Sequence, residues 1–261
     1  MSSTETEPKH GGDLLQLENV TMRYGAIAAL QDVSLGVAAG EVVALLGDNG
    51  AGKSTAIKII SGSVKPTSGR LVFEGIPREF ESPRASKELG IEIVYQDLSI
   101  CMNVDVVANF FMGRELVKRV LGVPVLRERE MQRITEKVMA DGGTKVKSVR
   151  QNAEHLSGGQ RQAIELNRFV YWGGKLVVLD EPFAALGIEQ VRRGLENIRR
   201  VRDQGLAVII VTHNLHHAFQ IADRLVVFRQ GRLVLDKSTS DCTHETVSQA
   251  ITGDGPPVQI Q

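Results

Sequence analysis

The sequence is poor in cysteine and in net charge, and each lack excludes a class of protein. Its 261 residues include two cysteines, Cys101 and Cys242, which lie far apart and outside any metal-ligand spacing. We therefore expect reduced, structural thiols, not a disulfide framework or a zinc site. Lysine and arginine total 31, and so do aspartate and glutamate. Because a nucleic-acid-binding protein usually carries a basic excess, we expect no nucleic-acid partner.

Long apolar runs are also lacking. A membrane-spanning helix needs about 18 to 20 apolar residues, and no run in the sequence approaches that length. The first twelve residues are polar and contain no apolar secretion segment, which predicts a cytoplasmic protein. We expect residues 1–13 to form a flexible tail and residues 253–261 a loosely ordered end. With 42% hydrophobic and 24% charged residues, the composition is that of an ordinary soluble globular protein.

A glycine-rich segment at residues 47–55 is the first feature that carries chemistry. It reads GDNGAGKST and fits the phosphate-binding pattern G-x-x-x-x-G-K-[ST] without a mismatch. Residues 41–46 before it form an apolar stretch of strand length, and apolar residues recur after it at helical spacing until Gly62 ends the helix. Between a strand and a helix, such a loop binds phosphate through backbone N–H groups and the helix N-terminus. The candidate ATP-binding residues are Gly47, Asp48, Asn49, Gly50, Ala51, Gly52, Lys53, Ser54 and Thr55.

Two acids at the end of a buried strand complete this chemistry. Residues 176–179 form an unbroken apolar run, as in a parallel strand buried on both faces, and Asp180 and Glu181 follow it. In parallel sheets the ligand chemistry lies at the carboxyl ends of the strands. We expect Lys53 to reach the β- and γ-phosphates, and Ser54 and Asp180 to hold Mg²⁺. Glu181 is then placed to orient and polarise the attacking water.

A second strand-end residue is His213. Residues 207–211 form a further buried strand, and Thr212 and His213 follow it. A histidine at a strand end can donate a hydrogen bond to a γ-phosphate; the alternative is a solvated histidine that opens the next helix. His216 and His217 lack a nearby cysteine or further histidine to complete a metal site, so we expect them on a helix surface.

Residues 157–160 have the form S-x-x-Q, which is a capping box at the start of a helix. The apolar face of that helix would include Ala163, Ile164, Leu166 and Val170. The two glycines after the cap leave backbone N–H groups bare of side chains, which makes a second anion site. An ordinary helix start is the alternative interpretation.

The segment LSGGQRQ at residues 156–162 resembles the signature motif of ABC transporter ATPases. Its place also fits, because it lies between the two Walker motifs, the glycine-rich segment at 47–55 and the strand with its acids at 176–181. The resemblance covers about residues 15–237. It implies two nucleotide-binding subunits packed head to tail, with two ATP molecules between them. Each ATP then contacts the glycine loop of one subunit and the signature helix of its partner. The resemblance assigns to that contact Ser157, Gly158, Gly159 and Gln160.

Three further residues gain roles from the resemblance alone. Tyr24, in the setting Arg23-Tyr24-Gly25, resembles the aromatic residue that stacks on adenine; otherwise it would be an ordinary strand-end aromatic. Gln96 resembles the glutamine that links Mg²⁺ and the attacking water to the helical subdomain. His213 resembles the switch histidine.

The segments YQDLS (95–99) and VVANFFMGRE (106–115) resemble those of monosaccharide importers, the ribose, xylose and fructose group. This implies a subunit at the cytoplasmic face of the inner membrane that energises uptake through integral membrane permease subunits. A second copy of the chain completes its sites, and an extracytoplasmic sugar-binding protein is an indirect partner. Three places depart from most of the family: Gly187 stands where an aspartate is common, Phe183 is less usual, and residues 167–172 are unlike the common Ala-Arg-Ala-Leu run. These departures concern coupling between subunits, not nucleotide binding.

The fold class that we expect is α/β. It is a P-loop NTPase core, a mostly parallel sheet flanked by helices, with an antiparallel β subdomain and an α-helical signature subdomain at about 97–165. The antiparallel segments are 15–22, 33–37 and 70–76. One domain spans 14–240, and 241–261 form a C-terminal segment and tail. In the helical subdomain, exposed residues near 110–116 are expected to receive a short permease helix, and an apolar stripe is predicted at Val104, Val107, Ala108 and Phe111.

Two other functions stay open at this point. One is a nucleotide-sensing ABC module with little turnover, against which Glu181 and His213 argue. The other is a soluble, non-transport ABC ATPase, which would need long coiled-coil insertions or a second cassette with basic linkers, and the sequence shows neither.

Overall fold

The computed structural model describes residues 12–94, 100–184 and 187–254. Its centre is a six-stranded sheet in the order β12-β11-β3-β10-β9-β6, in which every neighbouring pair except β11 and β12 is parallel. The predicted buried strands at 176–179 and 207–211 are interior strands of this sheet, β9 and β10. The bounds are β3 (Val42–Leu46), β6 (Ile91–Val94), β9 (Leu176–Asp180), β10 (Ala207–Val211), β11 (Arg224–Arg229) and β12 (Arg232–Ser238).

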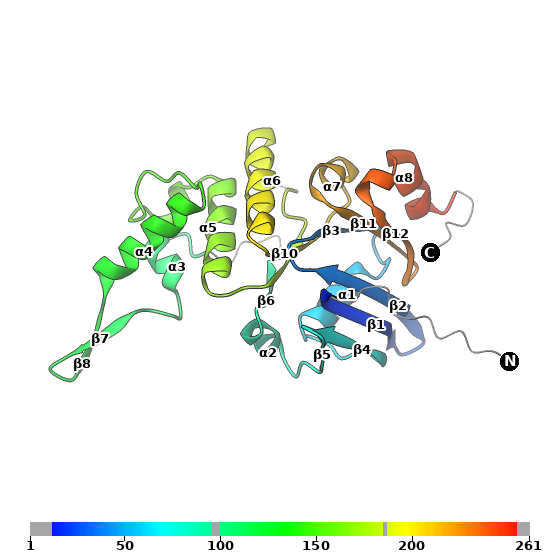
Figure 1. Ribbon diagram of the computed structural model, residues 1–261, viewed down its shortest axis with the longest axis horizontal. Coiled ribbons are helices and arrows are strands. Elements are labelled where there is room, and N and C mark those ends of the chain that lie inside the picture. Colours follow the sequence, from blue (N-terminus) through cyan, green and yellow to red (C-terminus); the bar gives the residue numbers. More distant parts are fainter. Residues whose placement is uncertain (1–11, 95–99, 185–186, 255–261) are drawn as a thin grey trace.

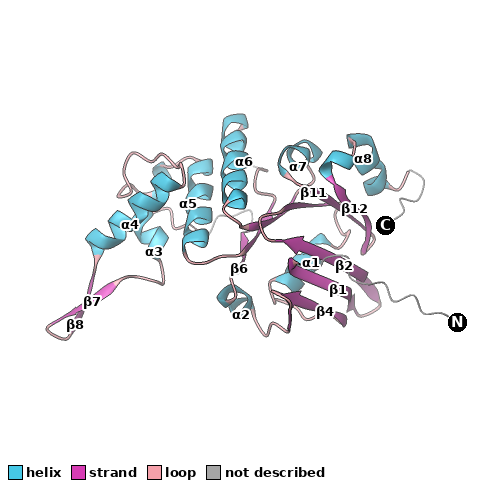
Figure 2. Ribbon diagram, in the orientation of Figure 1, coloured by secondary structure: helices cyan, strands magenta, loops and turns pink. Residues whose placement is uncertain are grey.

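Alternate residues of these strands point to opposite faces of the sheet and enter two separate cores. Val43 and Leu45 enter the core that contains α1 (Lys53–Ile60). Val42 and Ala44 enter the core on the other face, beneath four helices (Figure 2). Because both faces are covered, the strands are apolar without interruption. The four helices are α5 (Gly158–Tyr171), α6 (Ile188–Asp203), α7 (Leu215–Ile221) and α8 (His244–Thr252).

A second, antiparallel sheet lies against α1 and closes the first core. Its order is β2-β1-β4-β5, and it contains the three segments that the sequence predicted to be antiparallel. Leu15, Val33 and Phe73 are fully buried in the same core as α1. The bounds are β1 (Asp13–Tyr24), β2 (Ile27–Ala38), β4 (Ser68–Phe73) and β5 (Ile76–Arg78).

A helical subdomain packs against α5 around a third core. It contains α3 (Val106–Phe111), α4 (Glu128–Asp141) and the 3₁₀ helix η1 (Ala153–His155). The predicted stripe is partly wrong. The Asp105 side chain accepts a hydrogen bond from the Ala108 N–H at 2.7 Å and starts the helix, so Val104 lies before it. Ala108 is exposed, whereas Phe110 and Phe111 are each 1% exposed. The predicted docking residues therefore begin at Met112.

Several elements were not predicted from the sequence. Between α3 and α4 the chain forms a β-hairpin, β7 (Val117–Val120) and β8 (Val123–Leu126), which projects from one end of the molecule (Figure 1). Helix α8 packs Val247 and Ala250 into the second core, beside β11. Helix α2 (Pro83–Glu88) precedes β6, and the 3₁₀ helix η2 (Thr239–Asp241) precedes α8. None of the helices in the described ranges is long and apolar enough to cross a membrane.

Candidate functional site

The glycine-rich loop joins β3 to α1 in a conformation that its glycines permit. Gly47 and Gly52 have φ angles of 136° and 115°, which residues with a side chain rarely adopt. A Cβ at Gly47 would lie 2.2 Å from the Phe228 carbonyl oxygen, and one at Gly52 would lie 2.9 Å from that of Ala29. Neighbouring strands thus press against the outer side of the loop, and only glycine fits at both positions.

The other side of the loop presents backbone donors. Within the part of the chain that the structure describes, the N–H groups of Gly50, Gly52, Lys53 and Ser54 donate no hydrogen bond. Gly52 is the N-cap of α1 and offers no side-chain acceptor to the first turn. Unpartnered N–H groups that converge on a helix N-terminus form an anion site. The predicted phosphate cradle therefore has the required donors.

Lys53 is folded onto this loop. Its Nζ donates hydrogen bonds to the carbonyl oxygens of Gly47, at 2.5 Å, and Asp48, at 3.0 Å. Burial lowers the pKa of the Lys53 ammonium, against the charges of Glu181, Asp48 and Asp180, which raise it. The ammonium is thus the positive centre of a partly buried, acidic site, and a phosphate oxygen can replace either carbonyl partner.

Glu181 and His213 come from the ends of two neighbouring strands and contact each other. The parallel register of β9 and β10 pairs Asp180 with Val211, so the residues that follow emerge at one edge. Glu181 Oε1 lies 2.7 Å from His213 Nδ1 and accepts the His213 backbone N–H at 3.0 Å. Glu181 has a φ of 48°, which is uncommon outside glycine. The structure therefore brings together two of the three predicted catalytic residues; the third, Gln96, lies outside the described residues.

Thr212 also belongs to this group, and the sequence did not single it out. Its buried hydroxyl donates to Glu181 Oε2 at 3.3 Å and accepts the Asn214 backbone N–H at 3.1 Å. The Glu181 carboxylate is thus held on both oxygens. A polar residue at the end of a buried strand was the one available signal for Thr212.

Two of the three predicted Mg²⁺ ligands, Asp180 and Ser54, lie in the described structure. Asp180 is the last residue of β9, and Ser54 is in the first turn of α1. Burial and then the charge of Glu181 raise the pKa of the Asp180 carboxyl, while Lys53 lowers it. Hydroxyl and carboxylate oxygens are donors that Mg²⁺ prefers. The described residues contain no group of three or more His, Cys, Asp or Glu arranged to hold a metal ion; a site with a single carboxylate does not need one.

Two further predicted residues are Tyr24, which the structure describes, and Gln96, which it does not. Tyr24 is half-exposed at the end of β1. The next strand places Ala29 and Leu30 against Gly52, so the β1–β2 turn lies beside the glycine loop.

The signature segment starts α5 with the predicted capping box. The Ser157 Oγ accepts the Gln160 backbone N–H at 3.3 Å, and Gln160 Oε1 accepts the Ser157 N–H at 2.9 Å. Gln160 Nε2 also donates to the Lys145 carbonyl at 2.7 Å. Of the predicted apolar face, Ala163, Ile164 and Leu166 are buried, and Val170 is partly buried.

The signature helix lies apart from the glycine loop. Figure 1 shows α5 beside the helical subdomain and α1 beneath the central sheet. Between residues 157–160 and 47–55, as described, no hydrogen bond or ion pair is formed. The two predicted anion sites are therefore separate within one chain.

Phe183, the unusual residue after the acidic pair, is a packing residue. It is 5% exposed, and its ring meets that of His217 edge-on at 5.4 Å between centroids. A Cβ at Gly194 would lie 2.7 Å from the Phe183 ring, so the ring fills the space that Gly194 leaves. His217 is partly buried on α7, and burial lowers its pKa; His216 is exposed, as predicted for a helix surface. Among the described residues, no atom lies within 4 Å of a Cβ added at Gly187, so none of them requires glycine there.

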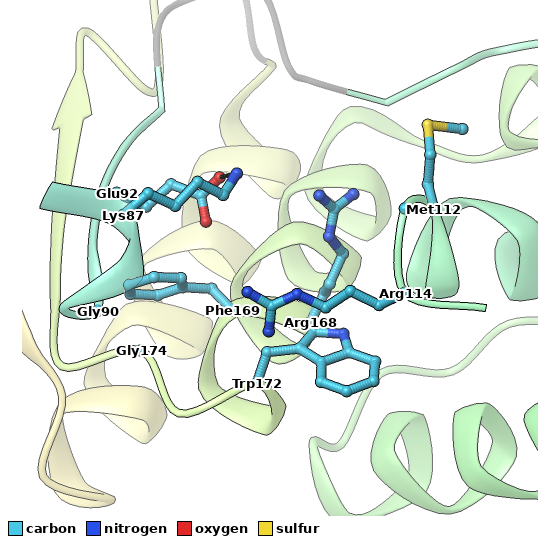
Figure 3. Close-up of a pocket in the computed structure, with 10 residues that line it drawn as sticks. Lys87, Gly90, Glu92, Met112, Arg114, Arg168, Phe169, Trp172 and Gly174 are labelled. Carbon is cyan, nitrogen blue, oxygen red and sulfur yellow. Dashed lines mark hydrogen bonds and ion pairs between the residues drawn. The ribbon is translucent and has the colours of Figure 1, made fainter. Parts of the chain in front are cut away.

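A groove of about 210 Å³ separates the sheet from the helical subdomain (Figure 3). Met112 and Arg114 line it from the end of α3, and Phe169 and Trp172 line it from the end of α5. The Arg114 guanidinium lies over the Trp172 ring, 5.0 Å from its centroid, which is a cation–π contact. Arg168 adds a second cationic head. The groove thus combines aromatic surface with positive charge.

Comparisons with known proteins agree on one family. A family model described as ABC transporter matches residues 30–184. A xylose/arabinose import ATP-binding protein of Sulfolobus acidocaldarius is 40% identical over 92% of this chain and 94% of its own length. A fructose import ATP-binding protein of Rhizobium meliloti is 37% identical over 94% of this chain and 95% of its own length. Among solved structures, cbiO1 of Clostridium perfringens, part of the ABC transporter complex cbiONQ, has a TM-score of 0.76 at 25% identity and covers 91% of this chain and 93% of its own.

Proposed function

The chain belongs to the ABC transporter family, and on that premise we propose that it is the ATP-binding and ATP-hydrolysing subunit of a monosaccharide importer. The sugar class is supported by two relatives named for import of xylose/arabinose and of fructose. The observation that carries the enzymatic part is the Glu181 carboxylate, held by Thr212 and His213 at the strand edge beside Lys53.

Binding of the triphosphate is the task of the glycine loop. The N–H groups of Gly50, Gly52 and Ser54, which donate no hydrogen bond to any described residue, surround the phosphate oxygens, and Lys53 exchanges its carbonyl partners for them. Tyr24, at the neighbouring turn, stacks on the base. Ser54 and Asp180 are the candidate ligands of Mg²⁺, together with Gln96. When bound, that ion neutralises the charge that develops on the phosphates.

Hydrolysis is the task of Glu181. Its carboxylate accepts a proton from, and orients, the water that attacks the γ-phosphate. The contacts with Thr212 and His213 fix the direction of the carboxylate, and positioning of this kind accounts for much of enzymatic phosphoryl transfer. His213 is exposed at the surface and can turn its ring to a phosphate oxygen.

The complete site is formed by two copies of the chain. In support, Gly158 and Gly159, both buried, form the first turn of α5, and in the described structure residues 157–160 form no hydrogen bond with the glycine loop of the same chain. The dipole and N–H groups of this helix end suit an anion. A second copy, packed head to tail, brings this helix end to the γ-phosphate. Closure of the pair on ATP and its reopening after hydrolysis transmit motion.

The partners of this pair are permease subunits in the membrane, with the chain at the cytoplasmic face. The groove between sheet and helical subdomain is the docking site for a short permease helix. In support, its walls come from both parts, so a helix seated there follows their relative movement. Arg114 and Trp172 are the anchors that this partner contacts. An extracytoplasmic sugar-binding protein acts through the permease.

The enzymatic proposal is tested by Glu181→Gln, assayed for phosphate release with ATP and Mg²⁺. Loss of a positioned general base lowers turnover by about 100-fold or more, and ATP affinity stays unchanged. The matched control is Glu196→Gln on the exposed face of α6, which retains turnover. Near wild-type release by the Glu181 variant contradicts the proposal. A wild-type chain that binds ATP without releasing phosphate is instead a nucleotide-sensing module.

The transport proposal is tested by purification of the tagged chain from membranes, identification of the bound permease, and uptake assays with labelled pentoses and hexoses. We expect Arg114→Glu to release the permease while phosphate release by the isolated chain persists. A chain that copurifies with no membrane protein contradicts the importer assignment.

A further inference from the structure

The β7–β8 hairpin is the most exposed apolar part of the described chain. All eight residues of its two strands are exposed. Val123 is 61% exposed, and Leu121 at the tip is fully exposed. The base is anchored: the Arg127 N–H donates to the Leu116 carbonyl at 2.8 Å, and Leu116 packs on the core of the helical subdomain. The hairpin is thus anchored to the helical subdomain and exposes its apolar side chains to solvent.

The turn at the tip has an unfavourable residue for its conformation. Leu121 and Gly122 have φ angles of 51° and 83°, as in the type I′ turn of a two-residue hairpin. Asparagine or glycine is preferred at the first of these positions, because a leucine is strained at positive φ. Leu121 therefore combines backbone strain with full exposure of an apolar side chain. Neither property stabilises the folded chain, so the presence of leucine here indicates an external apolar partner.

Positive charge lies directly behind the apolar tip. Lys118 and Arg119 are in β7, and no acidic residue occurs between 117 and 126. In the described structure, neither side chain has an ion-pair partner. The register pairs Lys118 with Val125, two residues behind the Val120–Val123 pair that flanks the turn. The Lys118 backbone is thus about 7 Å behind that pair.

We propose that the hairpin tip inserts into an anionic lipid surface. Leu121, Val120 and Val123 enter the boundary between headgroups and acyl chains, where amphipathic elements bury about 5 to 10 Å. Lys118 and Arg119 then lie at the level of the phosphate groups, to which basic residues near a membrane are attracted. The spacing between apolar tip and basic residues matches the thickness of that layer.

A lipid surface fits these residues better than a protein surface does. Apolar residues occupy both faces of the ribbon: Val117 and Leu126 on one, Val120 and Val123 on the other. A protein would cover one face and leave the other in water, whereas acyl chains surround both. Pairing with another strand is also hindered on the β8 side, because Pro124 has no N–H to donate.

The position of the hairpin agrees with this inference, and this step alone rests on the proposed function. Gly113 and Arg114 line the groove that we propose as the permease site, and β7 begins at Val117. Figure 1 shows the hairpin and α2, which borders the groove, toward the same side of the molecule. A permease docked in the groove therefore holds the tip near the membrane.

The test is cosedimentation of the full chain with vesicles of phosphatidylcholine and phosphatidylglycerol, and with phosphatidylcholine alone. We expect binding to the anionic vesicles that weakens with salt. Leu121→Asn removes the apolar tip but suits positive φ, so the turn is kept and binding falls several-fold. Lys118→Ala combined with Arg119→Ala lowers binding about 25-fold, at about fivefold for each charge. Ile76→Asn, an exposed apolar residue of another hairpin, leaves binding unchanged.

The inference is overturned if the chain does not bind anionic vesicles, or if wild-type and Leu121→Asn bind them equally. It is also overturned if Leu121→Asn binds vesicles normally and instead loses a self-associated form of the chain or a detergent-solubilised complex with the permease. Phosphate release in solution is measured on the same samples and stays unchanged in every hairpin variant. A chain that binds vesicles without releasing phosphate supports this inference and contradicts the proposed function. A chain that releases phosphate without binding vesicles supports the proposed function and contradicts this inference.

Discussion

Glu181 has an unusual backbone conformation for its residue type. Its φ of 48° lies in the left-handed region, and its backbone N–H donates to the Val211 carbonyl of the neighbouring strand at 2.9 Å. This conformation ends β9 and turns the carboxylate toward Thr212 and His213. Residues held in such conformations cluster at functional sites. The strain at Glu181 is therefore an observation that supports its catalytic role independently of its position in a motif.

Lys53 allows a sharp test at the same scale. Lys53→Ala removes a charge-assisted contact with phosphate, of the kind worth about 1.5 to 3 kcal/mol, so ATP affinity falls about 10- to 100-fold. Direct titration with ATP measures this. Lys58→Ala, an exposed lysine later in α1, is the matched control and leaves affinity unchanged. Equal affinities of wild-type and Lys53→Ala would count decisively against the cradle.

At the scale of elements, the junction between α5, α6 and the segment after β9 depends on a complementary pair. The Phe183 ring occupies the space above Gly194. Alanine in a helix interior is normally better than glycine by about 1 kcal/mol. Here its Cβ would lie 2.7 Å from the Phe183 ring. We therefore expect Gly194→Ala to lower the free energy of unfolding by about 1 to 3 kcal/mol.

The cost of the same substitution falls once the ring is removed. Phe183→Ala alone leaves a cavity that lowers stability by about 3 kcal/mol or more, and in that background the Cβ of Gly194→Ala still meets Gln162 Oε1 at 2.8 Å but no longer the ring, so the substitution lowers stability less. Urea unfolding of the two single variants and the double variant measures the coupling. Gly187→Ala, which meets open space, is the control with little effect. Additive effects of the two substitutions would show that the ring and Gly194 do not share this space.

Strands β3, β9 and β10 and the antiparallel segments of β1, β2 and β4 follow from the sequence, because their side chains are buried on both faces or alternate into a core. The hairpin at 117–126 does not, because no core selects its strands and the surrounding segments are helical. The helical stripe was displaced for a local reason, the Asp105 cap. Helix α8 was missed since its burial depends on contact with β11 and β12. At the site, Gly47, Lys53 and Glu181 are recognisable from motif spacing. The Thr212 hydrogen bond and the Phe183–Gly194 contact depend on packing between distant segments, which spacing does not encode.

At the scale of the whole molecule, the chain carries two anion sites that do not meet. The glycine loop lies between the two sheets, whereas Ser157 and the glycines after it lie at the end of α5. The central claim is that the loop of one copy and the α5 end of another enclose the same ATP. Variants that disable one half of the site each are suited to test this claim.

The most direct measurement mixes two inactive variants. Lys53→Ala disables the loop. Ser157→Asp keeps an N-cap residue but places a negative charge against the γ-phosphate; Ser157→Asn, without the charge, is its control. In a mixed dimer both substitutions fall in one ATP pocket, and the other pocket is intact. Because about half of the dimers in an equal mixture are mixed, the mixture recovers up to about a quarter of wild-type phosphate release. The account predicts this recovery. No recovery, with mixed dimers demonstrated by differential tags, contradicts it.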